Sequence, residues 1–119
     1  MTDRPVWVPG PDHPITITPT AGRVTVRVQG RVVATTDAAV TLRESNYPAV
    51  QYIPMVDVDA DVLADSTTVT YCPYKGEATY LNVLGVADVI WTYREPYAAV
   101  AAIAGRVAFY PDKADISLS

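Results

Sequence analysis

Short segments of alternating or β-branched residues, each closed by a tight turn, recur along this chain and restrict it to antiparallel sheet. The clearest is residues 23–28, in which valines alternate strictly with polar residues, as in a strand with one face in water. Gln29-Gly30 then supplies a two-residue turn, and residues 31–35 return as the partner strand. Connections this short cannot make the crossovers that parallel strands need. We therefore predict a mainly β, antiparallel fold.

Further segments carry the same strand signals, and one segment has the signals of a helix. Residues 95–105 begin with a proline, are rich in alanine and end on Gly105, which predicts one short helix with a glycine cap. Residues 107–110 and 114–118 are expected to pair as a closing hairpin. In total we predict about nine short strands and one short helix. Besides those named, the expected strands are residues 39–44, 50–54, 67–72, 77–84 and 87–94.

The length of 119 residues suits a single domain. Half of the residues are apolar, enough to bury one core. Prolines at positions 5, 9, 11 and 14 predict that residues 1–14 form an extended arm. Residues 15–119 are then the single β-rich domain.

Charge and composition argue against several classes of partner. The net charge of −4 disfavours a nucleic-acid binder, which needs clustered lysine and arginine. The longest small-apolar stretch, residues 98–104, is far too short to span a membrane, and the N-terminus lacks the pattern of a secretory signal. One cysteine excludes an internal disulfide, and with one histidine it leaves too few ligands for a usual zinc site. We expect a cytoplasmic protein without metal or cofactor.

Glu44 is the first candidate site residue. In the strand predicted for residues 39–44, Val40 and Leu42 point toward the core, and the two-residue period places Glu44 on the same face. A carboxylate there must find a partner, leave the core at the rim of the sheet, or have its pKa raised. It is either a general base or ligand anchor, or a salt-bridged or turn-capping group at a strand end. Lys75 is a plausible partner.

Cys72 and Lys75 form the second candidate, because a cation three residues after a thiol, across a turn, favours the thiolate. Nucleophilic catalysis is one interpretation. The other is that Cys72 is a small hydrophobic residue and Lys75 a solvated turn residue. Cys72 shares its strand face with Thr68 and Thr70, which is more typical of a cleft wall than of a deep core.

Three aromatic residues are candidates for ligand binding. Trp91 and Tyr93 share one strand face, and Tyr52 follows Val50. Aromatic residues at strand spacing are more often core than ligand platform, although buried tyrosine hydroxyls need partners and could reach the same cleft as Glu44. His13 lies in the proline-rich arm, and we expect it to be exposed.

The segment TYCPYKGEATY, residues 70–80, resembles the family known as domain of unknown function 427, sometimes labelled nucleotidyltransferase-like. The resemblance extends in order through residues 31–36, 42–54 and 91–110 and covers most of residues 22–118. It implies a β-tent fold, in which antiparallel sheets lean together over a cleft. Other β-tent families often hold zinc through paired Cys-x-x-Cys hairpins, and this sequence departs from them because it has a single cysteine.

Three functions remain open. The first is binding of a small polar ligand in a cleft lined by Glu44, Tyr52, Cys72, Lys75 and Tyr93, with Trp91 nearby. The second is an enzyme of unknown reaction that uses Glu44 or Cys72 as base or nucleophile and Lys75 as electrostatic stabiliser. The third is a structural domain that self-associates through a sheet edge, so that a homo-oligomer is possible.

Overall fold

The computed structural model describes residues 4–119 and is mainly β, with ten strands in two antiparallel sheets. This confirms the predicted mainly β, antiparallel fold class. The strands are β1 (Ile15–Pro19), β2 (Val24–Val28), β3 (Arg31–Thr36), β4 (Val40–Glu44), β5 (Val50–Pro54), β6 (Leu63–Cys72), β7 (Gly76–Val83), β8 (Val86–Thr92), β9 (Arg106–Phe109) and β10 (Asp115–Leu118). Three short 3-10 helices complete the fold: η1 (Met55–Asp57), η2 (Ala60–Val62) and η3 (Ala98–Ile103).

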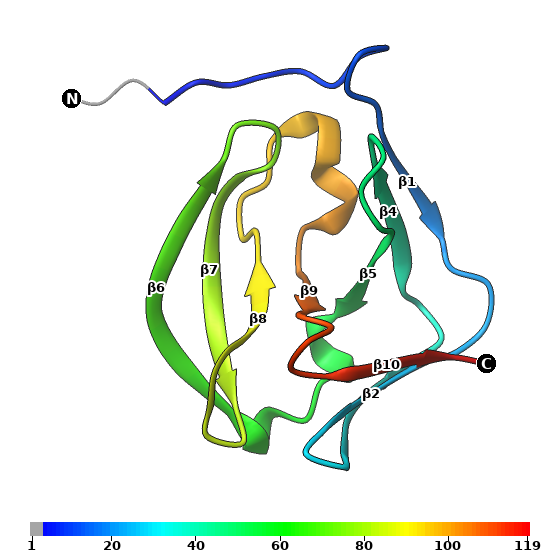
Figure 1. Cartoon of the computed structure of the whole chain (residues 1–119), viewed down its shortest axis with the longest axis vertical. Coiled ribbons are helices and arrows are strands. Elements are labelled where there is room, and N and C mark those ends of the chain that lie inside the picture. The colour runs from blue at the N-terminus through cyan, green and yellow to red at the C-terminus, as the bar shows by residue number, and fades with distance from the viewer. Residues whose placement is uncertain (1–3) are drawn as a thin grey trace.

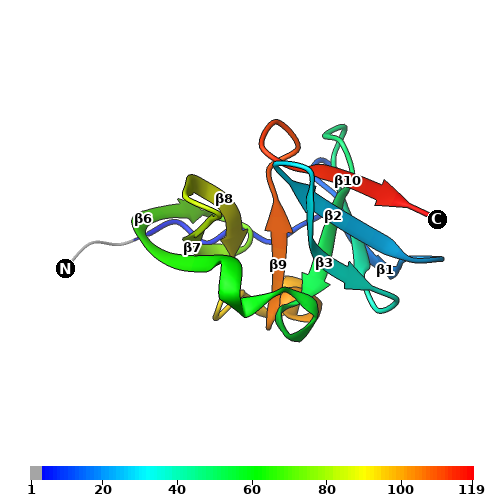
Figure 2. The same cartoon turned by 90° about the horizontal axis from the view of Figure 1, so that it is seen from below.

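The larger sheet has the strand order β1-β4-β5-β9-β8-β7-β6 and consists of two wings. One wing is β1-β4-β5 and the other is β6-β7-β8, and β9 joins them (Figure 1). The joint is narrow, because β9 forms only two residue pairs with β5 and two with β8. Seen from below, β9 lies between the wings (Figure 2). The sheet can therefore bend at β9 and bring the ends of distant strands together.

The smaller sheet, β10-β2-β3, helps to enclose the first core. Its inward valines, such as Val24 and Val26, are fully buried against residues of the larger sheet. Ile53, Leu81 and Phe109 supply that opposing face. The alternation that predicted β2 from the sequence thus comes from burial of its valines.

A second core lies on the other face of the larger sheet. Adjacent residues of a strand point to opposite faces, so Tyr52 belongs to this core and Ile53 to the first, and likewise Tyr80 and Leu81. Buried residues of η3 also contribute to it. This second face connects the two wings and carries the candidate site.

Two details of the predicted strands were wrong. β1 was missed, because Pro14 and Pro19 at its two ends made residues 15–19 look like a continuation of the extended arm. Proline is tolerated in an edge strand, and β1 lies at the edge of the larger sheet. The closing hairpin does not form: β9 pairs with β5 and β8, whereas β10 crosses to the smaller sheet and pairs with β2. With β1 the structure has ten strands, close to the predicted number of about nine.

The helix predicted for residues 95–105 is shorter and is a 3-10 helix, η3. Its two buried residues, Val100 and Ile103, are three positions apart, the period of a 3-10 helix. The backbone of Val100 is not helical, with φ −124°, which interrupts a segment already too short to hold a stable α-helix. Within residues 4–119, no helix has the length and apolar character needed to cross a membrane.

Candidate functional site

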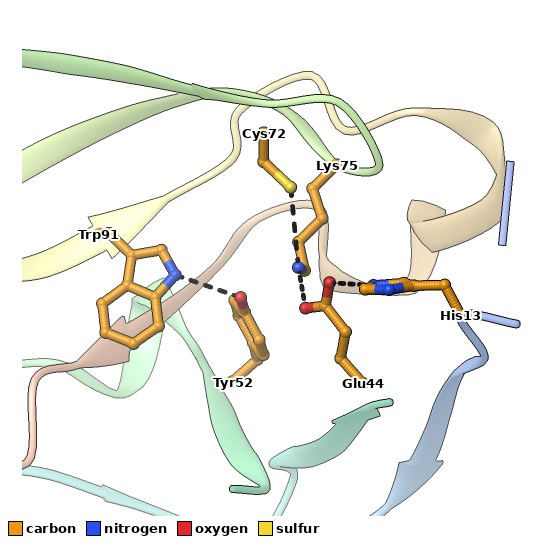
Figure 3. A network of polar contacts seen from close by, with 6 residues as sticks. All are labelled: His13, Glu44, Tyr52, Cys72, Lys75 and Trp91. Atoms are coloured by element: carbon orange, nitrogen blue, oxygen red, sulfur yellow. Dashed lines mark hydrogen bonds and ion pairs between the residues drawn. The ribbon is translucent and has the colours of Figure 1, made fainter. Parts of the chain in front are cut away.

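Glu44, Cys72 and Lys75 come together where the two wings meet at one end of the molecule (Figure 3). Glu44 is the last residue of β4, and Cys72 is the last residue of β6. The ammonium of Lys75 donates to Glu44 Oε1 and lies 3.9 Å from Cys72 Sγ. Lys75 is thus the partner of Glu44 that the sequence made plausible, and the pair bridges the two wings.

The turn between β6 and β7 fixes the position of Lys75. Cys72 and Gly76 are paired residues of these strands, and the amide of Lys75 donates to the carbonyl of Cys72 at 3.2 Å. Gly76 has φ +113°, a conformation that residues with a side chain rarely adopt. Its backbone also packs against Glu95, whose carbonyl oxygen would lie 3.4 Å from an added Cβ. The glycine thus allows the tight turn that directs Lys75 inward.

The ion pair is largely removed from solvent, since the side chains of Lys75 and Glu44 are 8% and 15% exposed. Burial by itself raises the pKa of the Glu44 carboxyl. Hydrogen bonds and charge attraction from Lys75 and His13 outweigh burial, so that the pKa of Glu44 lies below its ordinary value. Glu44 is therefore an anion at neutral pH with both oxygens occupied.

His13 is the second partner of Glu44, which corrects the expectation that it is exposed. Its Nε2 lies 2.7 Å from Glu44 Oε2, and its side chain is 23% exposed. Because a carboxylate only accepts hydrogen bonds, Nε2 carries the proton. The imidazole ring also stacks on Tyr74, with centroids 4.1 Å apart and planes 4° from parallel. The arm thus reaches Glu44 through His13.

The predicted aromatic residues lie deeper on the same face. Trp91 Nε1 donates to the hydroxyl of Tyr52 at 3.2 Å, joining β8 to β5 (Figure 3). Tyr52 is 1% exposed and Tyr93 is 8% exposed. Burial raises the pKa of both hydroxyls, and the nearby Cys72 and Glu44 raise it further, so both tyrosines are protonated. Trp91 is only partly buried, so its surface is more accessible to a ligand than that of either tyrosine.

Two pockets lie on the opposite face of the β6-β7-β8 wing. One of about 370 Å³ includes Tyr71 and Thr79 in its lining, and one of about 340 Å³ includes Leu81; Arg94 lines both. Thr79 and Leu81 alternate along β7 with Tyr80, which faces the candidate site. These pockets are therefore separate from the Glu44 cluster.

His13 and Tyr74 were the contacts that sequence reasoning missed. The available signal was the alternation of Ile15 and Ile17 directly after His13-Pro14. Recognising it as a strand would have placed that strand beside β4, where Ile15 pairs with Glu44. Across residues 4–119, no group of three or more histidine, cysteine or acidic side chains is arranged to hold a metal ion.

A family model described as a domain of unknown function, DUF427, matches residues 16–119. The match begins within β1 and extends to the last residue, so it includes every residue of the candidate site except His13. No curated protein shows significant similarity to the chain.

Proposed function

This chain belongs to the DUF427 family, whose description leaves its activity open, and we propose from the geometry that it binds a small polar ligand at the Glu44–Lys75–Cys72 cluster. The observation that carries the proposal is a buried ion pair that crosses between two wings and has a thiol beside it. Lys75 has three N–H donors, and Glu44 and Cys72 take two of them. The third has no partner within residues 4–119, and the proposal assigns it to an acceptor on the ligand.

The surroundings support a ligand with both polar and apolar character. Cys72, Trp91 and Tyr110 are partly exposed on the face that contains the ion pair. Trp91 and Tyr110 are in ring contact, with centroids 4.5 Å apart. Small-molecule sites combine such apolar surface with a few polar groups that set orientation. A single cysteine also fits the reducing cytoplasm, where we place the protein.

Native mass spectrometry of the chain isolated from its own cell tests the proposal. We expect a retained small molecule in the unmodified chain and its loss from the Glu44→Gln/Lys75→Met variant. Both charges are removed together there because a lone buried charge would threaten the fold. The matched control is Arg23→Met/Asp37→Asn, which removes an exposed ion pair between the start of β2 and the end of β3 and should keep the molecule. A chain that carries no small molecule, or equal retention in both variants, contradicts the proposal.

An enzyme is the second candidate function, and the proximity of Lys75 Nζ to Cys72 Sγ is the observation that favours it. A cation beside a partly exposed thiol is typical of reactive cysteines. Hydrogen bonds and charge from Lys75 and His13 hold the pKa of Glu44 below its ordinary value, which makes Glu44 a weaker base. The geometry therefore favours Cys72 over Glu44 as the reacting group in any such chemistry.

A further inference from the structure

His13 occupies a slot that has the properties of a ligand site. The face of Tyr74 forms one wall at 4.1 Å, and Glu44 Oε2 accepts from the imidazole Nε2–H at 2.7 Å. Tyr47 makes an edge contact with the ring, with centroids 6.3 Å apart. A flat wall, an aromatic edge and a carboxylate oxygen together select a planar ring with an N–H donor.

The segment that brings His13 to this slot is held mainly by contacts at the surface. Residues 4–8 are exposed, and the arm from residue 4 to 14 contains no strand or helix. It crosses the ends of the wings along one side of the molecule (Figure 1). Arg4 forms an exposed ion pair with Glu77, and the hydroxyl of Tyr71 donates to the carbonyl of Pro5. The amide of Trp7 donates to the carbonyl of Pro73, and its ring makes an edge contact with Tyr74. Each such contact contributes only about 1 kcal/mol, so the arm can detach locally without unfolding either core.

We infer that the slot between Glu44 and Tyr74 receives a planar nitrogen heterocycle with an N–H donor, and that His13 is the chain's own competitor for it. The inference rests on the proposed function, because both place a ligand against Glu44. The incoming ring replaces the imidazole on Glu44 Oε2 while Lys75 keeps Oε1. The apparent affinity of the ligand is then reduced by the fraction of molecules in which His13 fills the slot.

The test is binding of free imidazole to the full-length His13→Ala variant at pH 8, where the added ring is mostly neutral. Amide chemical shifts of Glu44 and Tyr74 report occupancy. We expect saturable binding at millimolar concentrations, and binding about tenfold weaker in the unmodified chain, where His13 competes. Thiazole, a planar five-membered ring without an N–H, should not bind. Equal binding of imidazole to both proteins, or equal binding of both rings, overturns the inference.

Two variants complete the experiment. His13→Ala/Tyr74→Ala lacks the stacking wall and should lose imidazole binding, whereas Val8→Ala changes an arm residue that is 79% exposed and should behave as the unmodified chain. If His13→Ala does not fold, hydrogen exchange of the Trp7 amide in the unmodified chain replaces it. That exchange should accelerate with imidazole and not with thiazole, and an unchanged rate refutes the inference. If imidazole does not bind but the chain retains a native ligand, the inference about the slot is wrong and the proposed function still stands.

Discussion

Replacing Lys75 by methionine is expected to lower the free energy of unfolding by about 3 kcal/mol. Methionine replaces the aliphatic part of the lysine side chain with an unbranched apolar chain of similar size, and it lacks the ammonium charge. Glu44 is then left as a largely buried carboxylate whose main cationic partner is gone, with only the hydrogen bond from His13 remaining. Removing one member of a buried pair costs more than the pair itself contributes, because the other charge stays desolvated. Urea denaturation measures the effect.

Two comparisons isolate that cause. Arg27→Met removes an exposed cation of β2 that forms no side-chain hydrogen bond or ion pair within residues 4–119, and should change the free energy of unfolding by less than about 0.5 kcal/mol. Glu44→Gln/Lys75→Met removes both charges and should recover a large part of the loss. If the double variant were as unstable as Lys75→Met, or if Lys75→Met were as stable as the Arg27→Met control, the ion pair would not be the buried link between the wings.

Replacing Tyr52 by alanine is expected to destabilise the chain by about 3–5 kcal/mol. Tyr52 is 1% exposed in the second core, where its ring packs edge-on against Trp91 with centroids 6.4 Å apart. The truncation leaves a cavity beneath the candidate site and also removes the hydroxyl that accepts from Trp91. Thermal and urea unfolding both measure this loss.

Tyr52→Phe separates the two contributions, because it retains the ring and removes only the hydroxyl. We expect a loss of about 1 kcal/mol, the usual contribution of one hydrogen bond. A Tyr52→Phe loss as large as that of Tyr52→Ala would show that the hydrogen bond, and not packing, dominates at this position. A small loss for Tyr52→Ala would contradict its placement in the second core.

The site was predictable from the sequence where the signal is local. Strand parity alone placed Glu44 on the face of Leu42, and the turn after Cys72 limited where Lys75 could be. The meeting of Glu44 and Lys75 depends on how the larger sheet bends at β9, a long-range property that no residue pattern specifies. The sequence therefore supported the pair as a hypothesis and left its geometry open.

His13 shows why the rest of the site escaped prediction. The prolines around it indicate an extended arm, and the structure does leave residues 4–14 without a strand. Whether an extended segment lies against the molecule depends on side-chain contacts, here with Glu44 and Tyr74, which lie 31 and 61 residues further along the chain. Such contacts leave no periodic trace in the sequence. Similarly, the partner of β10 was misassigned because proximity in sequence favoured β9 over β2.

An NMR titration of the unmodified chain with the small-molecule fraction of extract from its own cell tests most directly whether the Glu44–Lys75–Cys72 cluster is the binding site. Binding there predicts the largest amide shifts at Glu44, Cys72, Lys75 and Trp91, on the face where the two wings meet. Shifts concentrated at Thr79 and Arg94, which line a pocket on the other face, or no shifts at any concentration, would contradict it.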